Sequence, residues 1–182
     1  MNKNTMNILI VGAEKTDKYA IAKELQALDD DMMIAPVFTT DLRMKNYISD
    51  DFIYYMPSEE AELSYKNDAF MWVCSDDSRS LGVTKTDMYN ANIFVMSFAN
   101  FNNISNPTLK ELLDDGIICF IDSIANNSEV DFRESVFACE RIYASPYIYF
   151  LDDDVSVVVN TLLAYISGDA EERERIVEEM NG

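Results

Sequence analysis

The sequence predicts an α/β fold in which helices flank a mostly parallel sheet. Two observations predict it: apolar runs of strand length that alternate with helix-length segments, and a composition that suits a folded core. Of the 182 residues, 48% are hydrophobic and 12% are aromatic, which is enough for one domain with a substantial core. Strands that alternate with helices favour parallel pairing, because parallel neighbours need a crossover connection.

The first strand is expected at 7–11, where an uninterrupted apolar run is typical of a strand buried on both faces. A helix is expected over 18–28, because Ile21, Leu25 and Leu28 recur at helical spacing. Further strands are expected where apolar residues cluster again, at 32–40 (interrupted by Pro36), 52–56, 70–74, 92–98, 117–122 and 147–151. Further helices are expected after Ser58 as N-cap, over 132–144 and over 155–166.

One domain is expected over 1–168, followed by a charged tail over 169–182. Gly168 directly follows the last apolar helix and fits its end. The tail is rich in acidic and basic residues, so we expect it to be a solvated helix or to be partly frayed.

The charge balance disfavours several classes of partner. The chain has 33 acidic and 14 basic residues and a net charge of −19, which disfavours nucleic acid and anionic membranes. An acidic surface most often only keeps a protein soluble, and the alternative is a docking surface for a protein partner with a basic surface. No apolar run reaches the roughly 20 residues of a membrane span. The three cysteines are widely spaced and the chain has no histidine, so we expect no metal site, reduced thiols and a cytoplasmic protein.

A loop that follows the first strand is almost a phosphate-binding loop. The pattern G-x-x-x-x-G-K-S/T binds phosphate between a strand and a helix, and Gly12 and Lys18 stand at its first and seventh positions. Asp17 replaces the second glycine, and Tyr19 replaces the hydroxyl that binds magnesium. Gly12, Lys15 and Lys18 are therefore the candidates for nucleotide binding, and Lys18 is the candidate catalytic residue.

Taken in order, these segments resemble the guanylate kinase family of P-loop nucleoside monophosphate kinases. After the loop, 38–44 resembles the family's T-T-R-x-x-R stretch, 68–72 resembles G-E-F-x-E, and 82–85 resembles Y-G-T-S/T-K. The resemblance covers about 7–166 and implies a three-layer P-loop fold, with ATP and Mg²⁺ as cofactors if the chain is active. It implies substrate-binding roles for Thr40, Arg43, Tyr54 and Thr84, and lid roles for Arg133 and Arg141.

The positions that carry the family's chemistry are mostly substituted. The two arginines of the acceptor stretch align with Asp41 and Met44, the base-reading glutamate aligns with Trp72, and Ser97 lies near the place of the acid that assists magnesium. Because each transition-state cation of a phosphoryl-transfer enzyme contributes strongly to the rate, these losses disfavour ordinary kinase activity.

Three hypotheses about function follow. The first is a catalytically degenerate protein of this fold that acts as a binding or interaction module. The second is an active nucleoside or deoxynucleoside monophosphate kinase with a rearranged site, which uses Lys15, Lys18, Arg43 and the lid arginines. The third, an acidic decoy for nucleic-acid-binding proteins, is weaker, because the acids cluster at the ends of elements.

Overall fold

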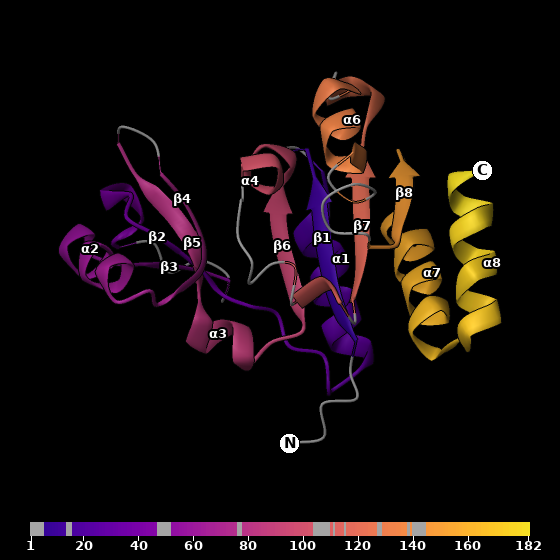
Figure 1. Cartoon of the computed structure of the whole chain (residues 1–182), viewed down its shortest axis with the longest axis horizontal. Helices are drawn as coiled ribbons and strands as arrows, with labels where there is room; N and C mark the ends of the chain where they lie inside the picture. Colours follow the sequence, from indigo (N-terminus) through magenta and orange to yellow (C-terminus); the bar gives the residue numbers. More distant parts are fainter. Residues whose placement is uncertain are drawn as a thin grey trace.

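The structure is a computed structural model of all 182 residues. It describes residues 6–13, 16–46, 52–75, 78–103, 110, 112–114, 116–126, 129–137, 139 and 145–182. They form two sheets and the helices that cover them (Figure 1). None of the helices in these ranges combines the length and the apolar character that a bilayer span requires.

The larger sheet, which we call the main sheet, is parallel throughout. Its strands lie in the order β6 (Ile93–Ser97), β1 (Asn7–Gly12), β7 (Gly116–Asp122) and β8 (Tyr147–Leu151). Ile10 of β1 pairs with Val95 of β6 and with Cys119 of β7. The carboxyl ends of β6, β1 and β7 therefore lie at one edge, where Gly12 pairs with Ser97 and Ile121.

Alternate residues of the main sheet pack against separate layers, as the period of a strand requires. One layer consists of α1 (Lys18–Leu28), α7 (Val155–Ser167) and α8 (Ala170–Asn181), whose buried side chains pack against Ile8 and Ile10. The other contains α4 (Phe98–Asn103), α6 (Glu129–Phe137) and part of a smaller sheet, which pack against Leu9 and Val11. The predicted three-layer α/β architecture is confirmed.

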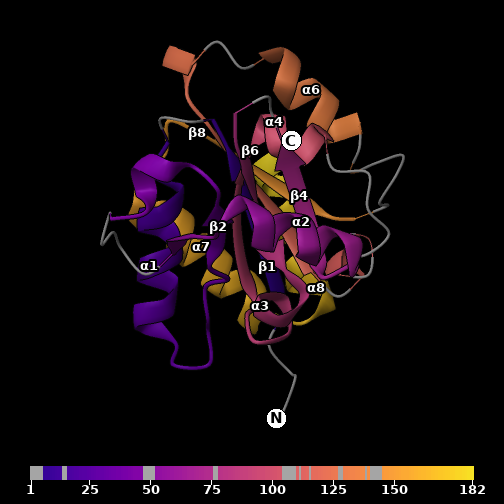
Figure 2. The ribbon, with the colours of Figure 1, turned by 90° about the vertical axis from the view of Figure 1, so that its left-hand side faces the viewer.

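The smaller sheet lies beside the main sheet and faces the viewer in Figure 2. Its order is β3 (Ile53–Tyr55), β2 (Val37–Thr39), β5 (Ser80–Thr84) and β4 (Phe70–Ser75). β2 and β3 are parallel, whereas the other pairs are antiparallel. The 3₁₀ turns η1 (Leu42–Met44) and η2 (Ile124–Asn126), with helices α2 (Ser58–Lys66) and α3 (Lys85–Tyr89), complete the described elements.

The predicted elements are confirmed except at three places. The strand expected at 32–40 is limited to Val37–Thr39, with an isolated bridge at Ile34, because Pro36 cannot donate to a ladder. Helix α2 begins at Ser58 itself, and the capping residue is Pro57, which offers no side-chain hydrogen bond. Helix α6 spans Glu129–Phe137 and so begins three residues before the predicted start, while residues 138 and 140–144 of the predicted helix lie outside the described residues.

The charge-rich end of the chain is an ordered helix in this structure. Asp169 caps α8, because its carboxylate accepts from the Glu172 N–H at 3.0 Å. Ile176 is buried against the layer of α1 and α7. Asn181 completes the free edge of β8: its amide accepts from the Tyr149 N–H at 3.1 Å and donates to the Tyr147 carbonyl at 2.7 Å. An edge strand with free backbone groups can pair with a strand of another chain. Helix α8 therefore occupies backbone groups of β8 that such a strand could bind.

Candidate functional site

The loop after β1 begins at Gly12, where three atoms approach closely. A Cβ at Gly12 would lie 2.6 Å from the Ile121 carbonyl oxygen, 2.8 Å from the Thr16 Oγ1 and 3.0 Å from the Lys18 Cδ. The next residue, Ala13, donates its N–H to the same Ile121 carbonyl at 3.3 Å. Packing of the loop against β7 therefore requires glycine at this position.

Lys18, the candidate catalytic residue, turns back onto its own loop. The residue is 6% exposed, and its Nζ donates to the Ala13 carbonyl oxygen. Nζ also lies 3.3 Å from the Thr16 Oγ1, and the Thr16 hydroxyl donates to the Ala13 carbonyl at 2.7 Å. The ammonium is thus bound by acceptors of the loop itself. Lys15, the other expected cation, lies outside the described residues.

The two substituted loop positions differ in their surroundings. Asp17 is exposed, and its φ of −79° is one that any residue adopts, so the backbone here does not require glycine. The Tyr19 ring stacks on Phe52 with 5.9 Å between the centroids, at the rim of the core between the main sheet and α1. Burial raises the pKa of Tyr19. The side chain at the family's magnesium-binding position is therefore used for packing.

Arg43, a predicted substrate-binding residue, forms a bidentate ion pair with Asp41. Its Nη2 lies 2.6 Å from the Asp41 Oδ2, and its Nε lies 3.0 Å from Oδ1. The hydrogen bonds from Arg43 lower the pKa of Asp41 to about 2. The residue that aligns with the family's first arginine thus binds the arginine two positions after it.

Thr40 supports the small sheet. It is buried, and its Oγ1 accepts from the Ser80 N–H at 2.7 Å. Its own N–H donates to the Ser80 carbonyl at 2.9 Å. Both bonds extend the pairing of β2 with β5 beyond the end of the strand.

Tyr54 and Thr84, two further predicted substrate-binding residues, are brought together by a carboxylate. The Thr84 hydroxyl donates to the Asp87 Oδ2 at 2.7 Å, and the Tyr54 hydroxyl lies 3.2 Å from the same oxygen. Thr84 also caps α3, because its Oγ1 accepts from the Asp87 N–H at 3.1 Å. Burial and the Asp87 charge raise the pKa of Tyr54. Both hydroxyls therefore lie against an acid, at positions where the family resemblance implies substrate binding.

Arg133, the lid candidate that the structure describes, lies on α6, beyond the carboxyl end of β7 in Figure 1. It is exposed and lines a cavity of about 310 Å³ between α6, β8 and α8. Within this cavity the Phe132 and Tyr149 rings stack at 4.2 Å. Arg141, the second lid candidate, lies outside the described residues.

Two carboxylates near these groups are absent from the predictions. Asp122 ends β7, is 7% exposed, and accepts from the Ser123 N–H at 2.8 Å and from the Tyr149 hydroxyl at 3.3 Å. Burial and the Asp122 charge raise the pKa of Tyr149 to about 12. Two sequence signals could have identified these residues as site candidates. Asp122 directly follows a buried apolar run, and Asp87 stands at the fourth position of the helix-capping pattern Thr-x-x-Asp.

The arrangement of both sheets agrees with a solved kinase structure. The crystal structure of guanylate kinase from Anaplasma phagocytophilum matches with a TM-score of 0.56, over 97% of this chain and 96% of that chain. This chain has a guanylate kinase-like P-loop fold. The sequence identity is 14%, so the likeness is one of fold. Scans of the sequence against protein-family models and against curated proteins give no match.

Proposed function

We propose that this guanylate kinase-like chain is catalytically degenerate and acts as an interaction module. The observation that carries the proposal is that four side chains expected to bind nucleotide or substrate are bound to acceptors of the chain. Lys18 binds the Ala13 carbonyl, Arg43 binds Asp41, and Tyr54 and Thr84 share Asp87. A phosphate would have to displace these acceptors and would meet two carboxylates there.

The described residues of the loop after β1 do not fit a Mg²⁺–ATP complex in the manner of a P-loop. A P-loop enzyme holds the metal with a loop hydroxyl and uses the lysine on the phosphates. Here the Tyr19 ring packs on Phe52, and the Lys18 ammonium binds the loop backbone. No step of phosphoryl transfer is therefore assigned to these side chains.

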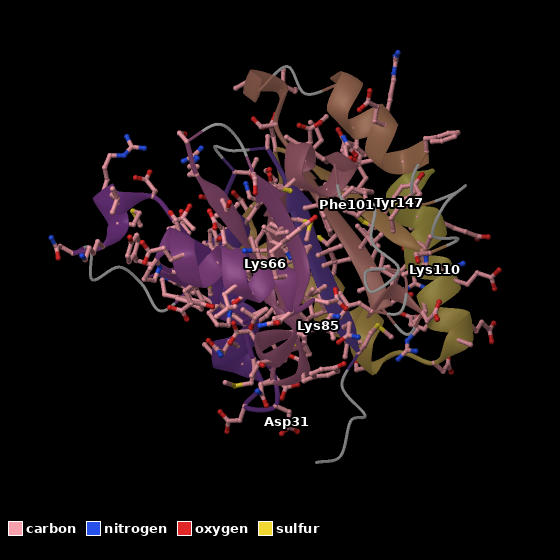
Figure 3. All side chains as sticks on the ribbon, turned by 60° about the vertical axis from the view of Figure 1, so that its left-hand side comes forward. Asp31, Lys66, Lys85, Phe101, Lys110 and Tyr147 are labelled. Carbon is pink, nitrogen blue, oxygen red and sulfur yellow. The ribbon has the colours of Figure 1, made fainter. Side chains whose placement is uncertain are left out.

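The partner that suits this chain is a protein with a basic surface. The net charge of −19 steers cationic surfaces toward the chain and repels nucleic acid. Exposed acidic residues lie on α2 and just after it, beside the smaller sheet (Glu59, Glu60, Glu62 and Asp68). Figure 3 labels Lys66 and Lys85 in the same region. Asp41 and Asp87, next to the strands of the smaller sheet, place negative charge beside candidate substrate-binding residues.

Thermal unfolding with nucleotides tests this proposal. We expect no rise in the melting temperature with ATP, GTP or nucleoside monophosphates, with or without Mg²⁺, because a ligand stabilises a protein only if it binds the folded state. A saturable rise at micromolar ATP would overturn the degenerate interpretation. A Lys18→Ala variant shows whether such binding uses the loop, and a Lys23→Ala variant serves as the matched control, because Lys23 lies on α1 outside the loop.

A second candidate is an active monophosphate kinase with a rearranged site. The observation that favours it is the buried carboxylate of Asp122 at the end of β7, the strand next to the loop, since an acid at this edge suits a metal. It would use Lys18, Arg43 and Arg133 as cations. ADP release with a deoxynucleoside monophosphate that is lost in both Lys18→Ala and Asp122→Asn would support it, and the absence of ADP release would exclude it.

A further inference from the structure

The outer edge of the main sheet is bound by side chains. In the described part of the chain, β8 is the last strand of this sheet. The Ile118 N–H of β7 donates to the Pro146 carbonyl at 3.2 Å, so Pro146 and every second residue after it direct their backbone groups toward β7. Tyr147, Tyr149 and Leu151 therefore direct their backbone groups outward, away from the sheet.

The Asn181 side chain binds these outward groups as a neighbouring strand would. Its amide oxygen accepts from the Tyr149 N–H at 3.1 Å, and its amide nitrogen donates to the Tyr147 carbonyl at 2.7 Å. A side-chain amide carries the same kinds of donor and acceptor as a peptide group, so Asn181 takes the place of one peptide of a paired strand. In addition, the Leu151 N–H donates to the Asp153 carboxylate at 3.0 Å.

The backbone that these side chains bind lies at the surface. Asn181, Asp153 and Leu151 are exposed, and α8 runs beside β8 at the end of the molecule opposite the smaller sheet (Figure 1). Asn181 also lines the cavity of about 310 Å³ between α6, β8 and α8. If the Asn181 side chain turned away, the groups that it binds would face solvent and the cavity.

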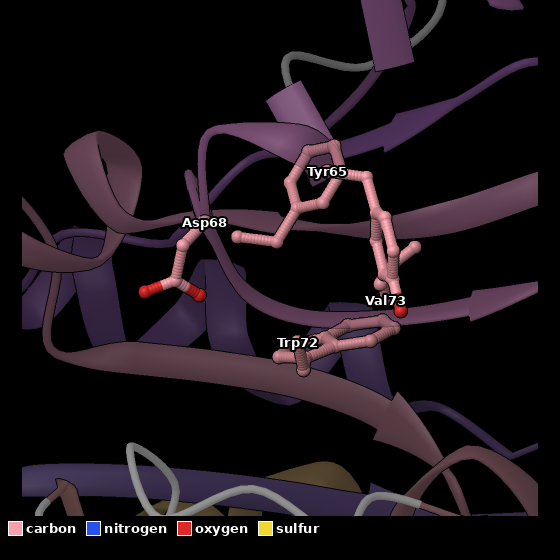
Figure 4. Close-up of a pocket in the computed structure, with 5 residues that line it drawn as sticks. Tyr65, Asp68, Trp72 and Val73 are labelled. Carbon is pink, nitrogen blue, oxygen red and sulfur yellow. The ribbon is translucent and has the colours of Figure 1, made fainter. Parts of the chain in front are cut away.

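The cavity of about 300 Å³ beside β4 of the smaller sheet differs in this respect (Figure 4). It is lined by Tyr65, Asp68, Phe70, Trp72 and Val73. There the Asp68 carboxylate binds another side chain, the Lys85 ammonium, at 2.6 Å. Of these two cavities, it is the one at Asn181 where a lining side chain holds the backbone of an edge strand.

We propose that Asn181 and Asp153 close the edge of β8 against a second copy of this chain. The outward groups of β8 are complementary to those of a second copy, because a two-fold axis places a strand antiparallel to itself. Such a pair would join two main sheets into one, which is the edge-to-edge association that natural sheets avoid. Only the last turn of α8 has to move for this pairing, since the buried anchor of the helix, Ile176, lies further back. The inference does not depend on the proposed interaction module.

Amide hydrogen exchange followed by NMR tests the caps themselves. In Asn181→Ala we expect the Tyr149 N–H to exchange about fivefold faster, as for the loss of one hydrogen bond, and the Leu151 N–H to exchange as in the wild type. In Asp153→Ala the Leu151 N–H should be the faster one. Asn181→Asp keeps an oxygen acceptor, so Tyr149 should stay protected. Equal acceleration of Tyr149 in Asn181→Asp and Asn181→Ala would mean that the packing of the helix end protects the edge, and would overturn the role of the Asn181 amide.

Sedimentation equilibrium tests the pairing between copies. The net charge of −19 itself opposes self-association, so the measurement uses about 1 M NaCl, where the Debye length is about 3 Å. We expect the double variant Asn181→Ala, Asp153→Ala to form dimers at concentrations at which the wild type does not change in mass. The matched control is Asn160→Ala, Asp30→Ala, which removes the same two side chains at exposed positions of α7 and of the turn after α1.

The Tyr149 amide shows whether such dimers use β8. If they do, its exchange in the double variant slows again as the protein concentration rises, because the second copy supplies the missing acceptor. An unchanged mass of the double variant, equal dimerisation of the control, or dimers in which Tyr149 still exchanges fast would each overturn the proposal.

Discussion

Replacing Gly12 by alanine tests whether the loop after β1 is part of the architecture. The new Cβ would lie 2.6 Å from the Ile121 carbonyl oxygen, an atom of the central strand β7 that cannot rotate away. It would also lie 2.8 Å from the Thr16 Oγ1 and 3.0 Å from the Lys18 Cδ. The substitution therefore forces either the strand or the Lys18 contacts to shift.

The expected loss follows from the cost of inserting a carbon into a packed region, typically about 1–3 kcal/mol. Because the nearest atom belongs to backbone, we expect the upper part of this range, roughly 2–3 kcal/mol. For a domain of this size each kcal/mol changes the melting temperature by about 2–4 °C. A decrease of roughly 5–10 °C should therefore be observed.

The assay is thermal unfolding for the melting temperature and urea unfolding for the free energy, both followed by the fluorescence of Trp72, which packs in the core shared by both sheets. Gly116→Ala is the matched control, because its Cβ would come no closer than 3.0 Å to the Asn7 carbonyl oxygen and 3.2 Å to the Leu112 carbonyl oxygen. Its small steric cost is offset by the roughly 0.4–1 kcal/mol that alanine contributes by restricting the unfolded chain. If both variants lose the same small amount of stability, the loop does not pack against β7 as described.

Three further predictions concern the ion pair, the buried acid and the last helix. Arg43→Ala should raise the Asp41 pKa from about 2 toward about 3.9 in a carboxyl NMR titration. Because folding lowers this pKa, the ion pair stabilises the fold above pH about 4, and this contribution is lost as the pH falls to about 2. Asp122→Asn should lower the Tyr149 pKa from about 12 in a ring-carbon NMR titration. Because folding raises this pKa, the contribution of the protonated Tyr149 to stability is lost as the pH rises from about 10 toward 12. An unchanged Tyr149 pKa in the variant would mean that burial alone raises it. Ile176→Ala should lower the free energy of unfolding by about 2–3 kcal/mol, and an unchanged urea midpoint would show that α8 does not belong to the folded core.

The main sheet follows closely from the sequence, because strands buried on both faces are uninterrupted apolar runs. The runs at 7–11 and 117–122 each lie within a strand that is one residue longer, and helix α1 has the predicted bounds, 18–28. The structure of the C-terminal segment is harder to predict from the sequence, because α8 buries few side chains and its acidic residues are typical of solvated segments. Its contact with β8 depends on Asn181, which is bonded to residues more than 30 positions away.

The candidate residues follow from sequence spacing, but their partners do not. Sequence spacing and the family resemblance indicate Lys18, Arg43, Tyr54 and Thr84 as candidate nucleotide- or substrate-binding residues, whereas their acceptors depend on how the chain folds. The Tyr54 hydroxyl meets Asp87, which is 33 positions away, and such a pair leaves no local pattern. The Asp41–Arg43 pair is local, but an arginine next to a substituted phosphate position gives no indication of which acceptor it binds.

Isothermal titration of the wild-type protein with Mg²⁺–ATP tests the central claim most directly. In this structure the Lys18 ammonium is bound by the Ala13 carbonyl and Thr16, and we infer that it does not bind a nucleotide phosphate. We expect no saturable heat at millimolar ATP, and the same flat titration for Lys18→Ala and Lys23→Ala. Micromolar binding by the wild type that Lys18→Ala abolishes and Lys23→Ala preserves would contradict it.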